Sequence, residues 1–351
     1  MADRRFLAAL LVLALPLPER AGACCPAFPR GAFAQIAAQE IAIVWDPAAK
    51  REHFIRRAAF RTGASDFGFL VPTPGVPELG EAPDALFARL GHAIEPERVT
   101  RTSLSLDSLL LSPLMLAASR SIPRESVAVK AVRVLLEQRV AGYDAVVLEA
   151  DDPAALAAWL KDKGYDSRPA LVDWAAPYVA AHWKITAFKL ALPADGKPAE
   201  GARYAVRMSF PTERALFPFR TPVDQSRDGP GRNLLRIFFI GPDRVQGRLG
   251  DAPWNPGVPY ARRRDDLSAL LADALPRGAA PAGGWLTAFE DHAWPRPVTG
   301  DLYFGADPGP EIVPPPVILH KSIPIPVELL VGGIGFGLWF RRRRRPAGAK
   351  P

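Results

Sequence analysis

The sequence predicts an α+β fold, built mainly of antiparallel sheets with a few packed helices, plus one C-terminal transmembrane helix. Three observations lead to this. Several segments alternate apolar and polar residues with period 2, most clearly 182–192 and 203–210. Two helical segments lie together near the middle of the chain. Hairpin-like order replaces the regular strand–helix alternation that is typical of a parallel sheet.

The first part of the body predicts strands and one helix. Residues 33–45 end in an apolar, β-branched run that is typical of a strand. Residues 52–61 and 66–71 flank the turn at 62–65, which predicts an antiparallel hairpin or meander. A helix is predicted over 83–93, where proline stands first.

A leucine- and serine-rich segment at 103–123 interrupts the body. A proline and an aspartate break its apolar run, so we do not interpret it as a second membrane span. We interpret it as an insertion, or as a seam near 103–125 between two subdomains. The next two segments, 127–140 and 143–150, predict strands.

The central helices carry clear boundary signals. Asp152 at the N-cap and Pro153 at the first helical position predict a helix start, and Gly164 predicts its end. A second helix is predicted at 169–181, bent or broken by Pro177.

The remaining body predicts more strands, a short helix and a stalk. Arg262 to Arg264, followed by two aspartates, read as a charge-compensated helix start. A proline-rich stalk is expected over 306–322. The strands are expected at 182–192, 203–210, 233–241 and, as the last strand, 285–294, with a helix at 265–275.

The N-terminus predicts a secretory signal peptide over residues 1–23. Two arginines precede a 12-residue apolar run at 6–17, which is too short to span a bilayer. An Ala-x-Ala pattern then predicts cleavage between Ala23 and Cys24. Acylation of Cys24 is an alternative, but Pro-Glu-Arg separates the apolar run from the small residues, so simple cleavage is favoured.

The C-terminus predicts a single membrane span at 323–340, where the one charge is Glu328. A helix of this length extends roughly 27 Å, close to the ~30 Å hydrocarbon core. The positive-inside rule keeps the basic tail, 341–351, in the cytoplasm and the body outside. The anchoring charges are Arg341, Arg342, Arg343, Arg344 and Arg345.

Two alternatives for this span stay open. Gly333 and Gly337 form a G-x-x-x-G pattern that permits a helix dimer, and hence a homodimer, although chance spacing explains it equally well. The segment also resembles bacterial sorting tails that are cut after export, but Pro326-Val327-Glu328 departs from their Pro-Glu-Pro motif.

Charge argues against nucleic acid as a partner. The chain carries +7, of which residues 1–23 hold +1 and residues 322–351 hold +5, so the body holds only +1. A nucleic-acid-binding domain needs clustered lysines and arginines on its folded surface. The membrane is therefore the expected partner, together with a protein or polysaccharide of the envelope.

Candidate catalytic, cofactor and metal residues are not found in the sequence. It has no nucleophile elbow, zinc-protease motif, phosphate loop or dinucleotide fingerprint. The two cysteines are adjacent, and the five histidines are dispersed. Glu149, Asp151 and Asp152 invite an acid–base interpretation, but helix capping explains Asp152 better. A group of aromatic residues could bind a sugar ligand by stacking, but packing in the hydrophobic core explains the group better. Its members are Trp159, Tyr165, Trp174, Tyr178 and Trp183.

Four stretches together carry a resemblance: DFGFLVPTPGVPEL (66–79), GYDAVVLEADDPAALAAWLKDKGY (142–165), YVAAHWKITAFKL (178–190) and FPTERALFPFR (210–220). The chain resembles the bacterial domain-of-unknown-function family 2330, with its signal and C-terminal-span layout. The resemblance implies an exported, anchored protein but no particular chemistry. Where members have cysteines flanking glycines and aromatics, this chain has Cys24-Cys25-Pro26, which puts a disulfide there in doubt.

The expected protein is a bacterial envelope protein, single-pass in the cell membrane, with its domain at 24–305 outside the cytoplasm. We expect a binding, scaffold or assembly role. The alternative is an extracytoplasmic hydrolase acting on an envelope polymer. A Ser/His pair or converging carboxylates in a pocket would favour the hydrolase, and an apolar groove would favour binding.

Overall fold

The computed structural model describes residues 25–27, 34–62, 68–105, 134–165, 168–190, 205–223, 234–293 and 300–324. The chain divides into two compact units. The first unit comprises Met1–Ile94 and Ser126–Val313, and the second comprises Glu95–Glu125 and Pro314–Pro351. Each unit is described by itself.

The first unit contains all the described helices and most of the strands. The helices are α1 (Ala85–Ala93), α2 (Pro153–Asp162), α3 (Pro169–Ala180) and α4 (Leu267–Leu270). The strands are β1 (Cys25–Ala27), β2 (Ala34–Asp46), β3 (Arg51–Thr62), β4 (Gly68–Thr73), β5 (Glu78–Ala82), β7 (Val134–Val140), β8 (Tyr143–Leu148), β9 (Lys184–Leu190), β10 (Ala205–Pro211), β11 (Leu216–Phe217), β12 (Leu235–Gly241), β13 (Val245–Leu249), β14 (Ala252–Pro253), β15 (Gly257–Arg264), β16 (Gly284–Asp291) and β17 (Leu302–Ala306).

Three sheets organise this unit. A five-stranded sheet has the order β1-β4-β9-β8-β7, and a seven-stranded sheet has the order β15-β16-β12-β2-β3-β10-β5. A four-stranded sheet has the order β11-β17-β13-β14. The pairings in these sheets are antiparallel except that β12 runs parallel to β2, so the predicted class of mainly antiparallel sheets with a few helices is confirmed for the described part.

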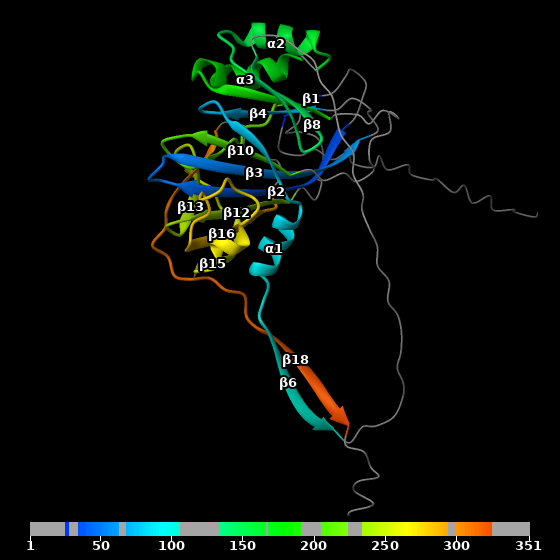
Figure 1. Cartoon of the computed structure of the whole chain (residues 1–351), viewed down its shortest axis with the longest axis vertical. Helices are drawn as coiled ribbons and strands as arrows, with labels where there is room; N and C mark the ends of the chain where they lie inside the picture. The colour runs from blue at the N-terminus through cyan, green and yellow to red at the C-terminus, as the bar shows by residue number, and fades with distance from the viewer. Residues whose placement is uncertain are drawn as a thin grey trace, which may run out of the picture. The chain divides into compact units, whose positions relative to one another are not determined.

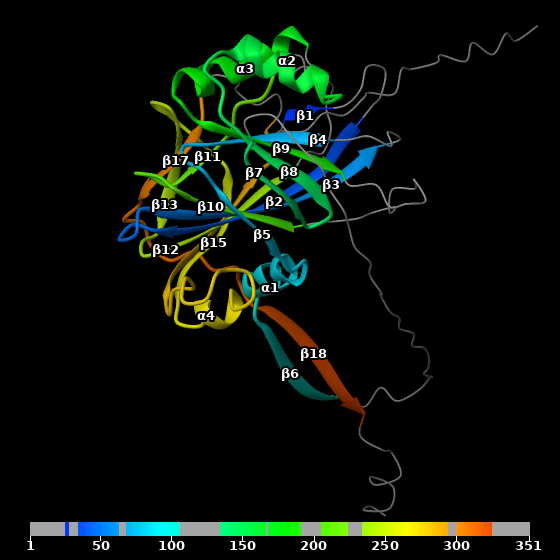
Figure 2. The same cartoon turned by 45° about the horizontal axis from the view of Figure 1, so that its top comes forward.

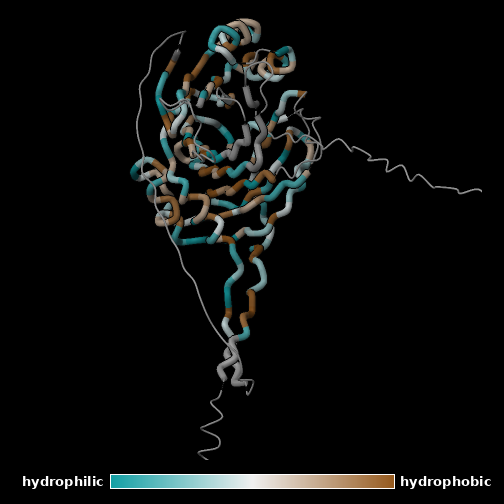
Figure 3. The backbone as a smooth tube through the Cα atoms, turned by 90° about the vertical axis from the view of Figure 1, so that its right-hand side faces the viewer, coloured by the Kyte–Doolittle hydropathy of each residue, from teal (hydrophilic) through white to brown (hydrophobic). Residues whose placement is uncertain are grey.

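The central core lies between the five- and seven-stranded sheets. It joins Ile41 and Ile43 of β2 to Phe69 of β4 and Phe188 of β9. The Phe69 and Phe188 rings stack with their centroids 4.8 Å apart. Side chains of the four-stranded sheet, such as Phe304, complete the same core. Figures 1 and 2 show the sheets stacked in layers, and Figure 3 shows hydrophobic stretches along their strands.

Helices cover the two remaining sheet faces. Helices α2 and α3 pack on the five-stranded sheet through a second core that includes Leu156, Leu160 and Ile185. Helices α1 and α4 cover the seven-stranded sheet through a third core that includes Leu86 and Leu267. Strand β12 is therefore apolar along nearly its whole length, because both faces of its sheet are buried.

The second unit contains a two-stranded parallel ribbon of β6 (Arg98–Ser105) and β18 (Val317–Pro324). Val317, Ile318 and Leu319 of β18 are exposed. The predicted stalk at 306–322 is thus paired from Val317 onward. Ile323 and Pro324, which begin the predicted span, also belong to β18 and pair with β6.

The predicted membrane span at 323–340 lies outside the described residues from position 325 onward. Among the described helices, none combines the length and the apolar character that crossing a bilayer requires. The signal peptide and most of the segment at 103–123 also lie outside the described residues.

Most of the predicted body elements are confirmed. The strand at 33–45 is β2, the helix at 83–93 is α1, and Asp152 caps α2 by accepting from the Ala155 amide at 3.2 Å. Gly164 ends that region with a φ of 78°, which glycine adopts readily. Helix α3 continues through Pro177. The strands at 127–140, 143–150, 182–192, 203–210, 233–241 and 285–294 correspond to β7, β8, β9, β10, β12 and β16.

Three predictions about these elements are wrong. Residues 52–61 and 66–71 form neither a hairpin nor a meander, because β3 pairs with β2 and β10 whereas β4 pairs with β1 and β9 in another sheet. Arg262 to Arg264 end strand β15 rather than begin a helix, and α4 spans only Leu267–Leu270 within the helix expected at 265–275. Strand β16 is not the last strand, since β17 and β18 follow it.

Candidate functional site

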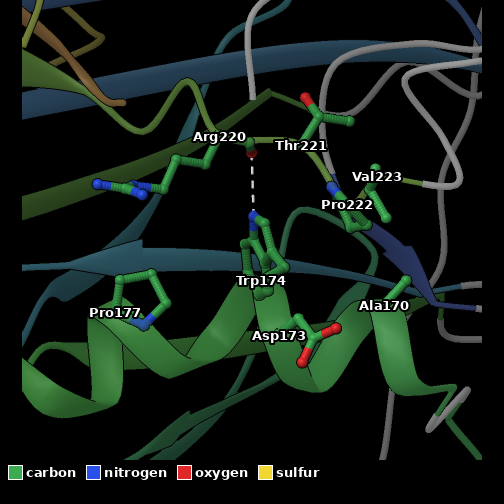
Figure 4. Close-up of a pocket in the computed structure, with 8 residues that line it drawn as sticks. All are labelled: Ala170, Asp173, Trp174, Pro177, Arg220, Thr221, Pro222 and Val223. Atoms are coloured by element: carbon green, nitrogen blue, oxygen red, sulfur yellow. Dashed lines mark hydrogen bonds between the residues drawn. The ribbon is translucent and has the colours of Figure 1, made fainter. Parts of the chain in front are cut away.

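A cleft of about 150 Å³ lies between helix α3 and the segment that follows β11. Figure 4 shows this cleft, with α3 on one side and the segment from Arg220 to Val223 facing it. Apolar side chains predominate in its wall, with Asp173 and Arg220 as the charged members. The lining residues are Ala170, Asp173, Trp174, Pro177, Arg220, Thr221, Pro222 and Val223.

Trp174 fixes the two sides of the cleft to each other. Its indole Nε1 donates to the carbonyl oxygen of Arg220 at 3.0 Å, the contact drawn in Figure 4. On α3, Trp174 also packs edge-to-face with Tyr178, with ring centroids 5.3 Å apart. An indole that is held by a partly buried hydrogen bond and by ring packing makes a rigid wall.

Asp301 organises the polar side of the cleft. Its Oδ1 accepts from the Tyr178 hydroxyl at 2.6 Å and from the Phe219 amide at 3.1 Å. Its Oδ2 accepts from Nε of Arg220 at 3.1 Å. Burial, followed by the charge of Asp301, raises the pKa of Tyr178 well above its usual value. Asp301 is therefore fully partnered, and it holds Arg220 at the cleft.

A second, smaller hollow adjoins the cleft, because Trp174 and Arg220 line both. We call it the inner hollow. Its volume is about 10 Å³, which is room for roughly one water-sized sphere. The lining residues are Phe54, Arg56, Leu70, Val71, Pro72, Trp174, Phe217, Pro218 and Arg220.

Arg56 gives the inner hollow its chemical character. It is only 3% exposed, and among the described residues its Nε, Nη1 and Nη2 have no hydrogen-bond partner. The ring of Phe69 covers its guanidinium, with 4.7 Å between Cζ and the ring centroid. A guanidinium carries five N–H donors in one plane and cannot be neutralised by losing a proton. The inner hollow therefore offers unused donors and an uncompensated positive charge.

A second buried charged residue lies on the same face of β3 as Arg56. Glu52 is fully buried, and its Oε2 accepts from the Leu216 amide at 2.8 Å while Oε1 has no partner. Burial raises the pKa of Glu52 well above its usual value, against the opposing effect of the Leu216 hydrogen bond. Glu52 lines neither the cleft nor the inner hollow.

The described residues also contain a Ser/His pair. Nδ1 of His53 lies 2.7 Å from Oγ of Ser209, on adjacent strands β3 and β10. His53 is 4% exposed and Ser209 is completely buried. Burial, aided by the charges of Arg51 and Arg207, lowers the pKa of His53 to about 4. The pair lines neither the cleft nor the inner hollow, and the Ser209 side chain has no contact with solvent.

The remaining candidate residues from the sequence have structural roles or lie outside the described part. Glu149 pairs with Lys184, and Asp152 caps α2. In the part of the chain that the structure describes, no three His, Cys, Asp or Glu side chains come together as a metal site. The following residues lie outside the described part: Ala23, Cys24, Gly333, Gly337 and Arg341 to Arg345.

The predicted aromatic group divides between packing and the cleft. Trp159 and Tyr165 stack with centroids 6.0 Å apart in the core beneath α2 and α3. Trp183 packs on Tyr178 with centroids 5.2 Å apart. Trp174 alone among the five lines the cleft.

Sequence reasoning missed Arg56. The signal for it was present, because side chains two apart on a strand share a face. Phe54 is an inward-facing core residue, so Glu52 and Arg56 face inward as well. A charged residue at an inward position of a strand is a strong sign of a special site.

The sequence matches one family model over residues 18–305, described as an uncharacterized protein conserved in bacteria. No curated protein matches the chain. Among solved structures, the crystal structure of baculovirus p35 is similar at 7% identity and a TM-score of 0.37, covering 80% of this chain and 96% of that one. The family match covers most of the sequence, and the chain therefore belongs to the DUF2330 family.

Proposed function

We propose that this chain is an exported protein of the bacterial envelope that presents a binding domain outside the cytoplasm. One C-terminal span over 323–340 would hold it in the membrane, with Arg341 to Arg345 inside. The sequence supports this topology at both ends, since a signal peptide and a span followed by arginines predict the same orientation. The nearly neutral body agrees with a partner other than nucleic acid.

The cleft at Trp174 is the observation that supports binding rather than catalysis. A concave, mostly apolar wall with a few fixed polar groups is typical of a ligand site. Its ion pair, Arg220 with Asp301, is structural, because the carboxylate is occupied by four donors. The described walls of the cleft bring together no nucleophile and base.

Photo-crosslinking tests the binding proposal. A photoreactive amino acid replaces Val223, which lines the cleft and is 44% exposed. Val76 is the matched control, since it is 47% exposed and does not line the cleft. We expect the full chain, irradiated in its native envelope, to form a defined adduct at position 223 but not at position 76. Equal labelling at both positions, or no adduct at 223, would contradict the proposal.

Reporter fusions test the topology separately. A periplasmic-type reporter joined after Pro351 should be inactive, and a cytoplasmic one active. The opposite result would overturn the orientation and leave the cleft result unaffected.

A hydrolase is the second candidate, because His53 and Ser209 lie within hydrogen-bond distance of each other. This candidate requires an opening that exposes a completely buried serine. Turnover of an envelope polymer by the purified full chain, lost in Ser209→Ala and retained in Thr212→Ala, would favour the hydrolase over the binding domain. Thr212 is a suitable control because it lies beyond the end of β10, and its hydroxyl donates only to the nearby Arg214 carbonyl.

A further inference from the structure

The inner hollow contains a charge imbalance that the proposed function does not explain. Two arginines, Arg56 and Arg220, line it, and one carboxylate, Asp301, pairs with one of them. The other lining residues are apolar or proline. One positive charge, on Arg56, therefore stays uncompensated beside a space that is large enough for a single small ion.

An uncompensated guanidinium at this depth is costly. Removing a charge from water without a partner costs several kcal/mol in proteins, roughly, even after relaxation. A side chain as long as arginine usually extends its charged end toward water. At Arg56 the three nitrogens instead have almost no solvent contact and no acceptor.

We propose that the inner hollow binds one monovalent anion against the guanidinium of Arg56. This goes beyond the proposed function, which concerns the outer cleft. The size of the hollow limits the ligand, because about 10 Å³ admits a single atom, such as a halide ion, or one oxygen of a carboxylate. A tetrahedral phosphate or sulfate is too large for this space, and sulfate carries twice the charge that Arg56 can neutralise.

The surroundings of Arg56 also match an anion rather than a neutral guest. Phe69 lies over one face of the guanidinium, so an acceptor must approach its N–H edge. Pro72 and Pro218 line the hollow and have no amide hydrogen of their own. The arginine edge is therefore the main donor available to an ion in this space.

Two sources can supply the anion. A free halide can occupy the inner hollow permanently. Alternatively, the carboxylate of a ligand in the outer cleft can reach it past Trp174 and Arg220, which line both spaces.

Thermal unfolding of the full chain in non-ionic detergent tests the proposal. The chain is melted at constant ionic strength while isethionate, which is too large for the hollow, is replaced by chloride, bromide, acetate or sulfate. We expect chloride to raise the Tm saturably, by about 3 °C at ten times its Kd. A response to chloride and bromide identifies a free halide, and a response to acetate alone identifies a carboxylate.

The variant Arg56→Met removes the charge and fills a similar volume. In isethionate it should unfold at the same temperature as the wild type or higher, and its Tm should no longer depend on the anion. Arg262→Met is the matched control, because Arg262 is exposed and pairs with Glu311 at 3.4 Å. This control should retain the full anion response.

A second measurement keeps the proposal testable if Arg56→Met does not fold. Crystals soaked in bromide should give an anomalous peak beside Arg56. A Tm that is the same in every anion, or an anomalous map without a peak in the inner hollow, would overturn the proposal and leave water as the occupant. The crosslinking result at Val223 is independent of either outcome.

Discussion

The two faces of strand β3 bury charged side chains in opposite ways. On the face toward α1, which we call the outer face, Arg57 pairs with Glu40 and lies over the Phe87 ring, 4.9 Å from its centroid. On the face toward the five-stranded sheet, which we call the inner face, Arg56 has no acceptor. Adjacent residues of one type thus meet opposite environments, one fully partnered and one not.

The same contrast holds for the two residues that lie four positions earlier on β3. On the outer face, His53 is bound to Ser209. On the inner face, Glu52 has one satisfied oxygen and one without a partner. Buried polar groups in proteins are nearly always hydrogen-bonded. Among the described side chains of β3, the inner face therefore holds the buried charged groups that folding leaves unsatisfied.

The largest expected effect is the difference between the stability losses caused by Arg57→Met and by Arg56→Met. Replacement of Arg57 by methionine leaves Glu40 largely buried, with only Arg236 at 3.6 Å. Because breaking a mostly buried pair leaves much of the desolvation penalty of Glu40 uncompensated, even with Arg236 nearby, we expect a loss of about 3 kcal/mol. Arg56→Met should cost no stability in isethionate, because no hydrogen bond is lost and a buried charge is removed. Urea denaturation of both variants measures the difference.

Equal losses in the two variants would contradict the comparison. That outcome would mean that Arg56 is held by contacts of its aliphatic stem, and the two faces of β3 would then be energetically alike.

The second prediction concerns His53 and acid. The folded pKa of about 4 lies below the ordinary value of 6.5, so the unfolded chain binds more protons between these two pH values. Stability should therefore fall as the pH drops from 6.5 to 4, by about 3 kcal/mol from this residue. His53→Gln should remove that part of the pH dependence. The measurement is the difference in unfolding free energy between the wild type and His53→Gln, taken at pH 7 and again at pH 4. A difference that is the same at both pH values would contradict the prediction.

Much of the fold could be predicted from the sequence because its signals are local. Asp152 and Pro153 marked the start of α2, and the alternation over 182–192 and 203–210 marked β9 and β10. Strand partners are not local. The turn at 62–65 predicts a hairpin or meander, but β3 and β4 belong to different sheets. Side chains of both strands pack in the core between those sheets, and this long-range packing leaves no local signal in the sequence.

The candidate site was harder to predict for the same reason. Trp174 and Arg220 are 46 residues apart in the sequence, and their hydrogen bond forms only in the folded chain. Arg56 could be placed on the inner face from its spacing of two residues from Phe54. Whether a hydrogen-bond acceptor lies near its guanidinium depends on all its neighbours in the folded chain. Short strands such as β11 and β14 have two residues each and leave no periodic pattern.

The third prediction concerns Glu52. Its raised pKa means that the folded chain binds more protons than the unfolded chain above about pH 4.5. Stability should therefore fall as the pH rises through that region. Glu52→Gln keeps the acceptor for the Leu216 amide and cannot ionise, so the variant should exceed the wild type by about 1 kcal/mol at pH 8 and equal it at pH 4. If Glu52→Gln is less stable than the wild type at pH 8, Glu52 is ionised in the folded chain and has a stabilising partner.

The smallest expected effect concerns Arg51, at the start of β3 on the outer face. Arg51 donates to Glu78 at 3.0 Å, and the two side chains are 35% and 54% exposed. Because exposed pairs contribute little, Arg51→Gln should change the unfolding free energy by less than ~0.5 kcal/mol. The same substitution removes a positive charge that lowers the pKa of His53.

A titration of the His53 imidazole, followed by NMR, therefore measures how the Arg51 charge affects the pKa of His53, separately from its effect on the unfolding free energy. The pKa of His53 should rise from about 4 toward its ordinary value in Arg51→Gln, while Lys50→Gln, which removes the exposed partner of Glu213, should leave it unchanged. Burial is the larger cause of the lowered pKa, so the rise should be partial. A His53 pKa that stays fixed in Arg51→Gln would assign the whole effect to burial. The outer face of β3 would then differ from the inner face in its hydrogen bonds alone, and not in the charges that surround them.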